Sequence, residues 1–495
     1  MPVTPPVAFA VEGGGPPALR PLASQHAVSP AFLDALGAVA PVDRDAHRLA
    51  EAGRDWWPLA VGWALAGEVP SLPAVITTPT TTAQVAAVVG LCSAHGVPLT
   101  AAGGRSGVCG ASLPLHGGVV LDTTALSGLV GVDDPSLTIE VLPGTFGDVL
   151  EDELRTRHGL TLGHWPQSMA LSTVGGWLAC RSAGQYSTRY GKIEDMVAGL
   201  EVVLADGSVI RTGGAPRAAV GPDLTQLFVG SEGTLGIVTR AWLRCHPAPA
   251  AERRAAWGFA TMAEGLDACR RILRRGATPA VLRLYDPAET QRSFDGERAA
   301  LLVLDEGDPA MVDAVLDVVD QECGTAERLD AGLVGRWLGH RSDVSVLEAL
   351  TRQGLVVDTM EVAGSWSALP VIYDSVISAL GGVSDTLVAS AHASHSYLDG
   401  ACLYFSFAGN PPAPDRERYY TDVWDAGARA TLAAGGVLSH HHGVGLNRSR
   451  FVAEALGGGL GVLRAVKAAL DPSGVLNPGK LGLPSPFGPV DWPPV

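Results

Sequence analysis

Apolar positions recur with helical spacing in the first quarter of the chain. In the stretch TTPTTTAQVAAVVGLCSAHG, Val85, Val88, Val89 and Cys92 fall at positions i, i+3, i+4 and i+7. A threonine before the first of them is a typical helix N-cap, and Gly96 is a typical helix end. We therefore predict an amphipathic helix here.

Short β-rich runs flank this helix, and the alternation of strands with helices indicates layered α and β structure. In the first half of the chain we predict strands at 75–76, 97–100, 119–122, 137–144, 200–205, 209–212 and 237–243, and a second helix at 148–158. Asp206-Gly207-Ser208 is a typical hairpin turn between two of these strands. The segment HPAPAAERR at 246–254 has the composition of a boundary.

Beyond that boundary, helices such as Met262–Arg275 alternate with strands such as Ala300–Leu304. We predict an α+β protein in four parts. These are an N-terminal leader and helical segment at 1–60, an α/β region at 61–248, a second α/β domain at 249–436 and a C-terminal segment at 437–495. The leader has one weak helical patch, near Ala31–Leu36, and no recognisable chemistry.

Charge and composition exclude several functions. The 495 residues include 35 basic and 51 acidic side chains, a net charge of −16, which is the wrong sign for a nucleic-acid binder. No apolar run reaches the ~18 residues of a membrane-spanning helix, and the N-terminus lacks the pattern of a secretory signal. Seven thinly spread cysteines without CxxC pairs favour a reducing compartment. We predict a cytoplasmic protein.

Three glycine-rich stretches carry the first hint of chemistry. AAGGRSGVCG (101–110) follows a strand, so that its N–H groups can form a concave anion site, although a tight turn explains this loop equally well. The stretches at 163–197 and 221–239 are likewise dense in Gly, Ser and Thr between β-rich runs. Together they favour a large phosphorylated cofactor.

The motifs STVGG, YGxIED, VVLADG and GSEGTLGIVT occur in the order found in the vanillyl-alcohol oxidase/PCMH superfamily of FAD proteins, which the chain resembles from about Leu72 to Pro247. LNPGK resembles the segment that returns to that domain. The resemblance implies FAD between two α+β subdomains of a PCMH-type domain, with an α/β cap domain over the isoalloxazine.

On this resemblance we assign residues to the cofactor. They are Gly103, Gly104, Arg105, Ser106, Gly107, Pro166, Ser168, Thr173, Gly175, Gly176, Ser182, Gly184, Tyr190, Gly191, Ile193, Glu232 and Ile237. Some relatives tether FAD through a histidine in the first loop. Arg105 stands in that stretch here, so we predict non-covalent FAD.

Within the superfamily, GHWPQSMALSTVGGW, LRLYD, DTMEVAGSW, GACLYF and SHHHGVG are similar to the alkylglycerone-phosphate synthase family. That family exchanges an acyl group on dihydroxyacetone phosphate for a fatty alcohol, with the flavin N5 as electrophile and no net redox change. The resemblance implies a catalytic set and a substrate-binding set. The catalytic set is His164, Tyr404, His440, His441 and His442, and the substrate-binding set is Arg283, Thr359 and His395.

Two positions depart from the family pattern. Gln167 replaces an aspartate, and Leu347 aligns with an arginine. Both changes remove a charge from the expected site. The native substrate can therefore differ from the acylated phosphate sugar that the family uses.

The residues themselves allow further interpretations of the histidines. On an extended segment, His440 and His442 would share one face and His441 the other. Three adjacent histidines can also bind a metal or form a polar loop, although a histidine near a flavin is suited to proton transfer at neutral pH. His392 and His395 are further pocket candidates. The HxGDGNxH motif of metal-dependent hydroxy-acid dehydrogenases is absent, and we predict no metal.

Three functions remain. The first is an FAD enzyme of the synthase type acting on a small-molecule or lipid-like substrate. The second is an FAD oxidoreductase that oxidises an alcohol or 2-hydroxy acid with a histidine or tyrosine as base. The third is flavin binding without turnover. A homodimer and membrane-surface contact are both left open.

Overall fold

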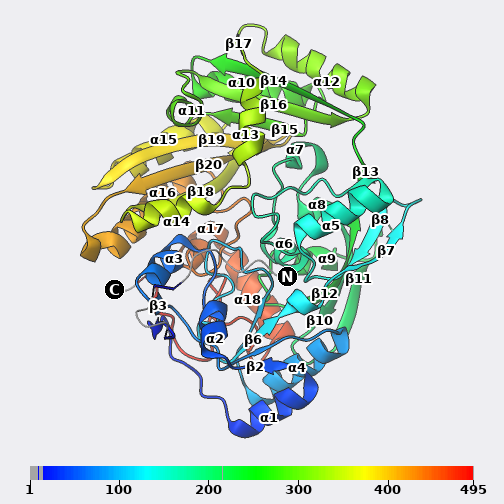
Figure 1. Ribbon diagram of the computed structural model, residues 1–495, viewed down its shortest axis with the longest axis vertical. Helices are drawn as coiled ribbons and strands as arrows, with labels where there is room; N and C mark the ends of the chain where they lie inside the picture. The colour runs from blue at the N-terminus through cyan, green and yellow to red at the C-terminus, as the bar shows by residue number, and fades with distance from the viewer. Residues whose placement is uncertain (1–8, 11–14, 215, 494–495) are drawn as a thin grey trace.

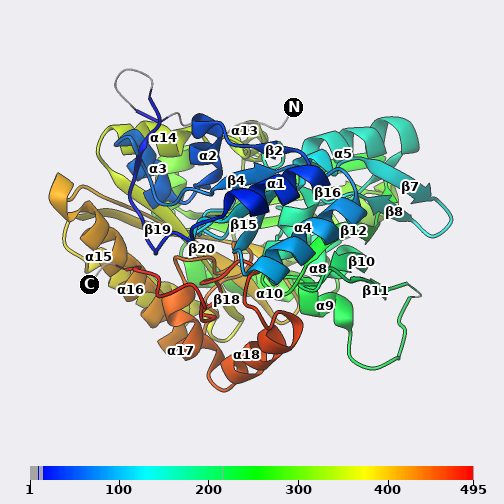
Figure 2. The ribbon, with the colours of Figure 1, turned by 90° about the horizontal axis from the view of Figure 1, so that it is seen from below.

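The computed structural model describes residues 9–10, 15–214 and 216–493. A seven-stranded sheet forms the upper part of the molecule in Figure 1, and two sheets of four and five strands form the lower part. Seen from below in Figure 2, the C-terminal helices α17 (Val452–Leu456) and α18 (Gly459–Leu470) lie along one edge. None of the helices in the described ranges combines the length and apolarity needed to cross a bilayer.

The four-stranded sheet has the order β2-β4-β6-β5. Its strands are β2 (Val42–Asp43), β4 (Val75–Thr77), β5 (Leu99–Ala102) and β6 (Val119–Asp122). Helix α4 (Thr82–His95) begins after Thr81, whose side chain accepts a hydrogen bond from the N–H of Gln84, and ends at Gly96 with φ 64°. All four predicted apolar residues of this helix are buried. The predicted helix is confirmed.

The five-stranded sheet has the order β11-β10-β12-β8-β7. Its strands are β7 (Leu129–Asp133), β8 (Thr138–Val141), β10 (Val197–Val203), β11 (Val209–Gly213) and β12 (Ile237–Arg244). Strands β10 and β11 pair antiparallel, which confirms the predicted hairpin. The second predicted helix is α5 (Gly147–Glu153), which continues as a π-helical turn over Leu154–His158.

The seven-stranded sheet has the order β17-β14-β16-β15-β19-β20-β18. Its strands are β14 (Ala251–Phe259), β15 (Val281–Tyr285), β16 (Ala299–Gly307), β17 (Glu327–Leu329), β18 (Val356–Ser365), β19 (Thr386–Ser396) and β20 (Gly400–Gly409). The helices that contact it include α10 (Met262–Arg274), α12 (Pro309–Glu322), α15 (Leu369–Gly381) and α16 (Arg416–Ala433).

Next to the cavity, alternation along β18, β19 and β20 gives the sheet one apolar and one polar face, whereas β14 and β16 contribute buried apolar residues to cores on both sides. Leu403 and Phe405 of β20 are fully buried in the core shared with α15 and α16. The intervening Tyr404 and Ser406 face the opposite side. The same alternation on β15, β18 and β19 places a set of polar side chains on that second face.

The two ends of the chain tie these parts together. Helices α1 (Pro30–Val39), α2 (Ala46–Ala52) and α3 (Pro58–Leu65) occupy the N-terminal stretch. The indole N–H of Trp57 donates to the hydroxyl of Tyr420 at 2.8 Å. At the other end, the N–H of Asn477 donates to the carbonyl of Leu99 at 2.8 Å. The C-terminal segment therefore returns to β5.

Candidate active site

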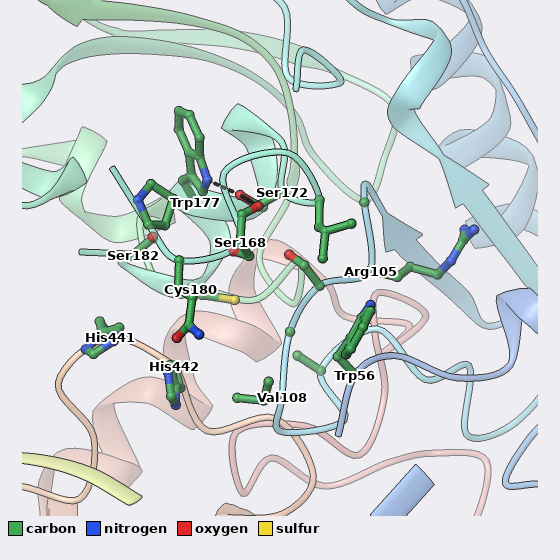
Figure 3. Close-up of a pocket in the computed structure, with 18 of the residues that line it drawn as sticks. Trp56, Arg105, Val108, Ser168, Ser172, Trp177, Cys180, Ser182, His441 and His442 are labelled. Carbon is green, nitrogen blue, oxygen red and sulfur yellow. Dashed lines mark hydrogen bonds between the residues drawn. The ribbon is translucent and has the colours of Figure 1, made fainter. Parts of the chain in front are cut away.

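A cavity of about 560 Å³ lies between the loops of the two smaller sheets and the polar face of the seven-stranded sheet. Figure 3 shows Trp56 and Val108 on one side of it and Cys180, His441 and His442 on another. The predicted site residues that line it are Gly103, Gly104, Arg105, Ser106, Gly107, Pro166, Ser168, Thr173, Gly175, Gly176, Ser182, Glu232, Ile237, Arg283, Thr359, His395, Tyr404, His441 and His442.

The loop after β5 presents backbone donors to this cavity. Within the described chain, the N–H groups of residues 104–107 donate to no protein acceptor. A Cβ on Gly103 would lie 2.3 Å from the hydroxyl oxygen of Thr173, and a Cβ on Gly104 would lie 1.9 Å from the carbonyl oxygen of Leu171. Only glycine fits there, and the free N–H groups suit an anionic diphosphate. The loop therefore fits the diphosphate of FAD.

The second glycine-rich stretch forms the facing wall. Thr173 caps helix α6 (Val174–Cys180) by accepting a hydrogen bond from the N–H of Gly176. The indole N–H of Trp177 donates to the hydroxyl of Ser172 at 2.7 Å (Figure 3). These bonds hold a row of small residues against the cavity, where a flat ring system can pass.

Four predicted cofactor residues lie behind this wall, outside the lining. They are Gly184, Tyr190, Gly191 and Ile193. A Cβ on Gly184 would lie 2.3 Å from the N–H nitrogen of Trp165, and the hydroxyl of Tyr190 donates to Glu306 at 2.8 Å. The N–H of Ile193 donates to the carbonyl of Ser182. Their contacts are with the protein and support the wall.

Glu232 joins the third glycine-rich stretch to the segment after the histidines. Its carboxylate accepts hydrogen bonds from the N–H of Val444 at 2.6 Å and of Gly445 at 2.9 Å. Burial raises the pKa of this carboxyl to about 7, although these bonds and the charge of Lys480 oppose the rise. Glu232 therefore lines the cavity, and both of its carboxylate oxygens accept hydrogen bonds from the backbone.

Tyr404 lies at the centre of the polar face. In the sheet register it stands between Glu361 on β18 and His392 on β19. Thr359 donates a hydrogen bond to the Tyr404 hydroxyl at 3.0 Å, and the His392 ring stacks on Tyr404 at 4.9 Å. Burial raises the pKa of Tyr404 well above its ordinary value, so its proton is retained and available for donation.

His392 and His395 both line the cavity, for different reasons. His392 follows the alternation of β19, and its Nδ1 lies 3.0 Å from a carboxylate oxygen of Glu289. His395 would point to the opposite face of a regular strand. A bulge between Ser394 and Ser396 places it at φ 51°, and this turns it to the same side as His392.

The three consecutive histidines form a turn around the buried carboxylate of Glu361. The N–H groups of His441 and His442 donate to Oε1 of Glu361 at 3.1 and 2.8 Å. Arg448, which is fully buried, donates to both oxygens of the same carboxylate. Burial favours protonation of Glu361, but the charges of Arg448 and His442 outweigh it and hold the pKa well below its ordinary value.

This turn overturns the prediction of alternating faces. The segment is bent instead of extended, since Glu361 gathers successive N–H groups. His441 and His442 therefore line the cavity together, with ring centroids 4.5 Å apart, whereas His440 lies outside the lining.

His164 lies one layer behind the cavity. It is fully buried, its Nε2 is 3.1 Å from the hydroxyl of Ser182, and its ring packs on Trp177 at 4.6 Å. Burial lowers the pKa of His164 to about 3. Within the described residues it is Ser182, not His164, that faces the cavity.

Gln167 and Leu347, the two residues that depart from the family pattern, both line the cavity on the side of helix α14 (Ser345–Arg352). The amide of Gln167 donates to the carbonyl of Asp343 at 3.3 Å. Leu347 joins Val344, Val346 and Leu350 to form an apolar wall. Two neutral side chains thus lie in this part of the lining.

Sequence reasoning missed some of the lining. Trp56 comes from the N-terminal stretch where no chemistry was recognised, and Cys180 and Asp358 also contribute. Ser394, a further residue of the lining, did have a usable signal, because in AHAS (391–394) polar residues alternate with alanines as on one face of a strand. Trp56 had no comparable signal.

We predict that Gly104→Val abolishes cofactor binding, because the new side chain would displace the loop from the Leu171 carbonyl. The purified variant should lack the visible absorbance of a flavin. Gly62→Ala is the control, since a Cβ there meets nothing within 4 Å. A fully flavin-loaded Gly104→Val protein would contradict the assignment of this loop.

We predict that Glu361→Gln costs about 3–5 kcal/mol of unfolding free energy, because it leaves the Arg448 charge buried without its partner. Urea unfolding measures the change. The control is Glu454→Gln, which breaks an exposed pair with Arg429 and should cost less than about 1 kcal/mol. Equal losses in the two variants would refute the role of Glu361.

Comparison with known proteins agrees with an FAD-binding fold. A family model for an FAD binding domain matches residues 73–213, and a model for the C-terminal domain of FAD linked oxidases matches residues 248–481. YgcU of Escherichia coli (strain K12), described as an uncharacterized FAD-linked oxidoreductase, is 32% identical over 438 residues, which cover 83% of this chain and 89% of that protein.

Alkyldihydroxyacetonephosphate synthase of Dictyostelium discoideum is 30% identical over 456 residues, which cover 84% of this chain and 74% of that protein. A solved structure of alkyldihydroxyacetonephosphate synthase superposes on this chain with a TM-score of 0.77 and is 25% identical in sequence. The superposition covers 93% of this chain and 88% of the synthase chain. The predicted α+β fold and the predicted FAD cofactor are confirmed. The chain is a flavoenzyme and belongs to the FAD-linked oxidase family.

Proposed function

We propose that this enzyme exchanges an acyl for an alkyl group on an anionic, chain-bearing substrate, as the resemblance to the alkylglycerone-phosphate synthase family implies. The observation that carries the proposal is the presence, in one cavity, of an apolar wall and of a guanidinium, that of Arg283, which forms no ion pair among the described residues. A phosphate and a hydrocarbon chain on one molecule would match these two surfaces.

Arg283 provides the charge. Among the described residues that line the cavity, the arginines are Arg105 and Arg283, and no lysine is present. Arg105 is 3.5 Å from Asp122, at the diphosphate end. Arg283 is held by its Nε, which donates to the hydroxyl of Tyr285 at 2.6 Å. Its terminal nitrogens remain for a substrate anion.

The apolar wall provides the second surface. Val344, Val346, Leu347 and Leu350 from the α14 side face the cavity together with Val357 of β18. Val346 is 54% exposed, so the wall extends toward the protein surface. A hydrocarbon chain could leave the cavity along it, and burial of that chain would contribute about 0.8 kcal/mol per methylene.

Acid and base groups lie between these surfaces. Burial, together with neighbouring histidines, holds the pKa of His441 well below its ordinary value, so the ring is neutral at pH 7 and can accept a proton. Tyr404 keeps its proton and can donate it. Bound FAD supplies an electron-accepting ring system. His441 and Tyr404 would hold and move the protons of the substrate.

The second candidate is oxidation of an alcohol or 2-hydroxy acid. Two observations favour it, the relationship to YgcU, described as an oxidoreductase, and the neutral His441, which suits removal of a hydroxyl proton. Arg283 would then hold a carboxylate.

We further propose that FAD is bound without a covalent link and that the protein is cytoplasmic. Arg105 occupies the loop position considered for attachment, and in Figure 3 its side chain extends away from the labelled histidines. All seven cysteines are unpaired thiols, as in a reducing compartment. A homodimer also stays a proposal.

Arg283→Met should raise KM for palmitoyl-dihydroxyacetone phosphate about 10²-fold, because a charge-assisted hydrogen bond worth up to about 3 kcal/mol is lost. Turnover is followed with hexadecanol as the second substrate. Arg336→Met, an exposed arginine that packs on Phe294 outside the cavity lining, is the matched control. An unchanged KM in Arg283→Met would rule out this anchor.

The visible spectrum recorded without oxygen separates the two candidates. We expect the flavin spectrum to persist when palmitoyl-dihydroxyacetone phosphate or simple 2-hydroxy acids are added, since the exchange has no net redox change. Bleaching by a 2-hydroxy acid or alcohol would establish oxidation and overturn the exchange proposal.

Acid precipitation tests whether FAD is bound without a covalent link. It should release all of the flavin to the supernatant, and flavin that stays with the precipitated protein would contradict the proposal.

A further inference from the structure

A continuous chain of hydrogen bonds leaves the cavity at His441 and returns to it at His395. Nδ1 of His441 lies 2.9 Å from Nδ1 of His440, and Nε2 of His440 lies 3.0 Å from the Tyr397 hydroxyl. That hydroxyl is 3.4 Å from Oγ of Ser187, which is 2.7 Å from Nδ1 of His395. Both end residues line the cavity, and the three linking residues do not.

We propose that His440, Tyr397 and Ser187 form a proton relay between His441 and His395. This inference rests on the proposed function only in assuming that His441 accepts a proton from the substrate. The relay would let the proton taken up on one side of the cavity be given back on another, without a cationic histidine in between.

The proton transfers balance along the hydrogen bonds of the relay. In one orientation His441 carries its proton on Nδ1, His440 on Nε2, and the two hydroxyls point toward His395. Uptake of a substrate proton at Nε2 of His441 forms one N–H bond, and Nδ1 of His441 passes its proton to Nδ1 of His440. Each following group passes on one proton, and Nδ1 of His395 receives the last. No electron is transferred, the linking groups end neutral, and the positive charge ends on His395, which returns the proton to the cavity from Nε2.

The charges around the relay disfavour the cationic, doubly protonated form of His440. The ammonium of Lys192 donates to the backbone carbonyl of His440 at 2.6 Å. Burial and Lys192 lower the pKa of His440 to about 3, with Glu361 and His442 also facing it. Glu361 is neutralised by Arg448, so its charge offers little compensation. Burial also holds the pKa of His441 and of His395 well below its ordinary value, so none of the three histidines retains a proton at rest.

Packing holds the relay in line. The rings of His395 and His440 stack at 5.1 Å, and those of Tyr397 and His440 at 5.7 Å. The backbone carbonyl of Tyr397 accepts a hydrogen bond from the indole of Trp366 at 3.0 Å. The positive φ of His395 turns its ring toward Ser187. The strained backbone thus closes the relay.

The relay can be tested in the resting enzyme by nitrogen NMR of FAD-loaded protein labelled at histidine. We expect neutral rings for His440 and His441 at pH 7, with the proton on Nε2 and Nδ1, respectively. Tyr397→Phe should shift the His440 Nε2 resonance and redistribute its two neutral forms. Tyr373→Phe, which removes a hydroxyl bonded to Asp286 instead, should leave both rings unchanged.

A cationic His440 at pH 7, or an unchanged His440 spectrum in Tyr397→Phe, would overturn the relay. So would a stoichiometric metal in the purified protein, measured by elemental analysis. Ligand atoms of Cys402, His440 and His441 lie within 4.8 Å of one another, and an ion there would occupy the nitrogens that the relay needs.

Turnover gives a second test, with palmitoyl-dihydroxyacetone phosphate and hexadecanol as the probe. Tyr397→Phe should lower kcat by about 10²-fold with an unchanged KM, the scale of a lost proton-transfer group. The dependence of kcat on the deuterium content of the solvent should be curved in the wild type, because several protons move, and linear in Tyr397→Phe. A wild-type rate and curve in the variant would refute the relay.

The two tests separate the relay from the proposed function. If the NMR result holds while the probe is not turned over, the exchange reaction is wrong and the relay stands, to be measured next with a 2-hydroxy acid. If the probe turns over and Tyr397→Phe changes neither the spectrum nor the rate, the relay is wrong and the exchange reaction stands.

Discussion

The fully buried carboxylate of Glu361 organises the site. It is compensated by Arg448, and its remaining lone pairs accept the N–H groups of His441 and His442. A buried ion pair is of little net benefit to stability unless further hydrogen bonds satisfy it, and here those bonds come from the histidine turn. The C-terminal segment thus gains its conformation from a strand of the seven-stranded sheet, and two histidines reach the cavity because of that carboxylate.

The seven-stranded sheet serves the site through the two-residue period of its strands. Leu403 and Phe405 anchor β20 in the apolar core, and the alternate Tyr404 and Ser406 are thereby fixed in the cavity wall. The cofactor loops depend on a different constraint, close approach of backbones. Gly103 and Gly104 leave no room for a side chain, and the N–H groups that follow find no acceptor in the part of the chain that the structure describes. One half of the cavity is therefore shaped by side-chain packing and the other by close backbone approach at glycine.

Local patterns predicted much of the fold. The cap and apolar spacing of α4 and the turn between β10 and β11 each depend on neighbouring residues, so their signals are complete in the sequence. The cofactor loops were found through motifs. The histidine turn was predicted wrongly, because an extended segment is the default expectation and the carboxylate that bends it lies 80 residues away in the chain. The position of His395 depends on a bulge that no local signal marks.

By itself, the sequence determined the class of the protein, an α+β fold that binds FAD. It also proposed glycine loops for the diphosphate and a set of histidines and a tyrosine for proton chemistry. These features are local, since glycine conformation and strand alternation need no distant partner. Only the tertiary structure decided which of those side chains meet. It placed His164 behind Ser182, brought Trp56 into the lining and aligned His441, His440 and Tyr397, because burial and hydrogen bonding between distant segments select one arrangement that no short stretch of sequence encodes.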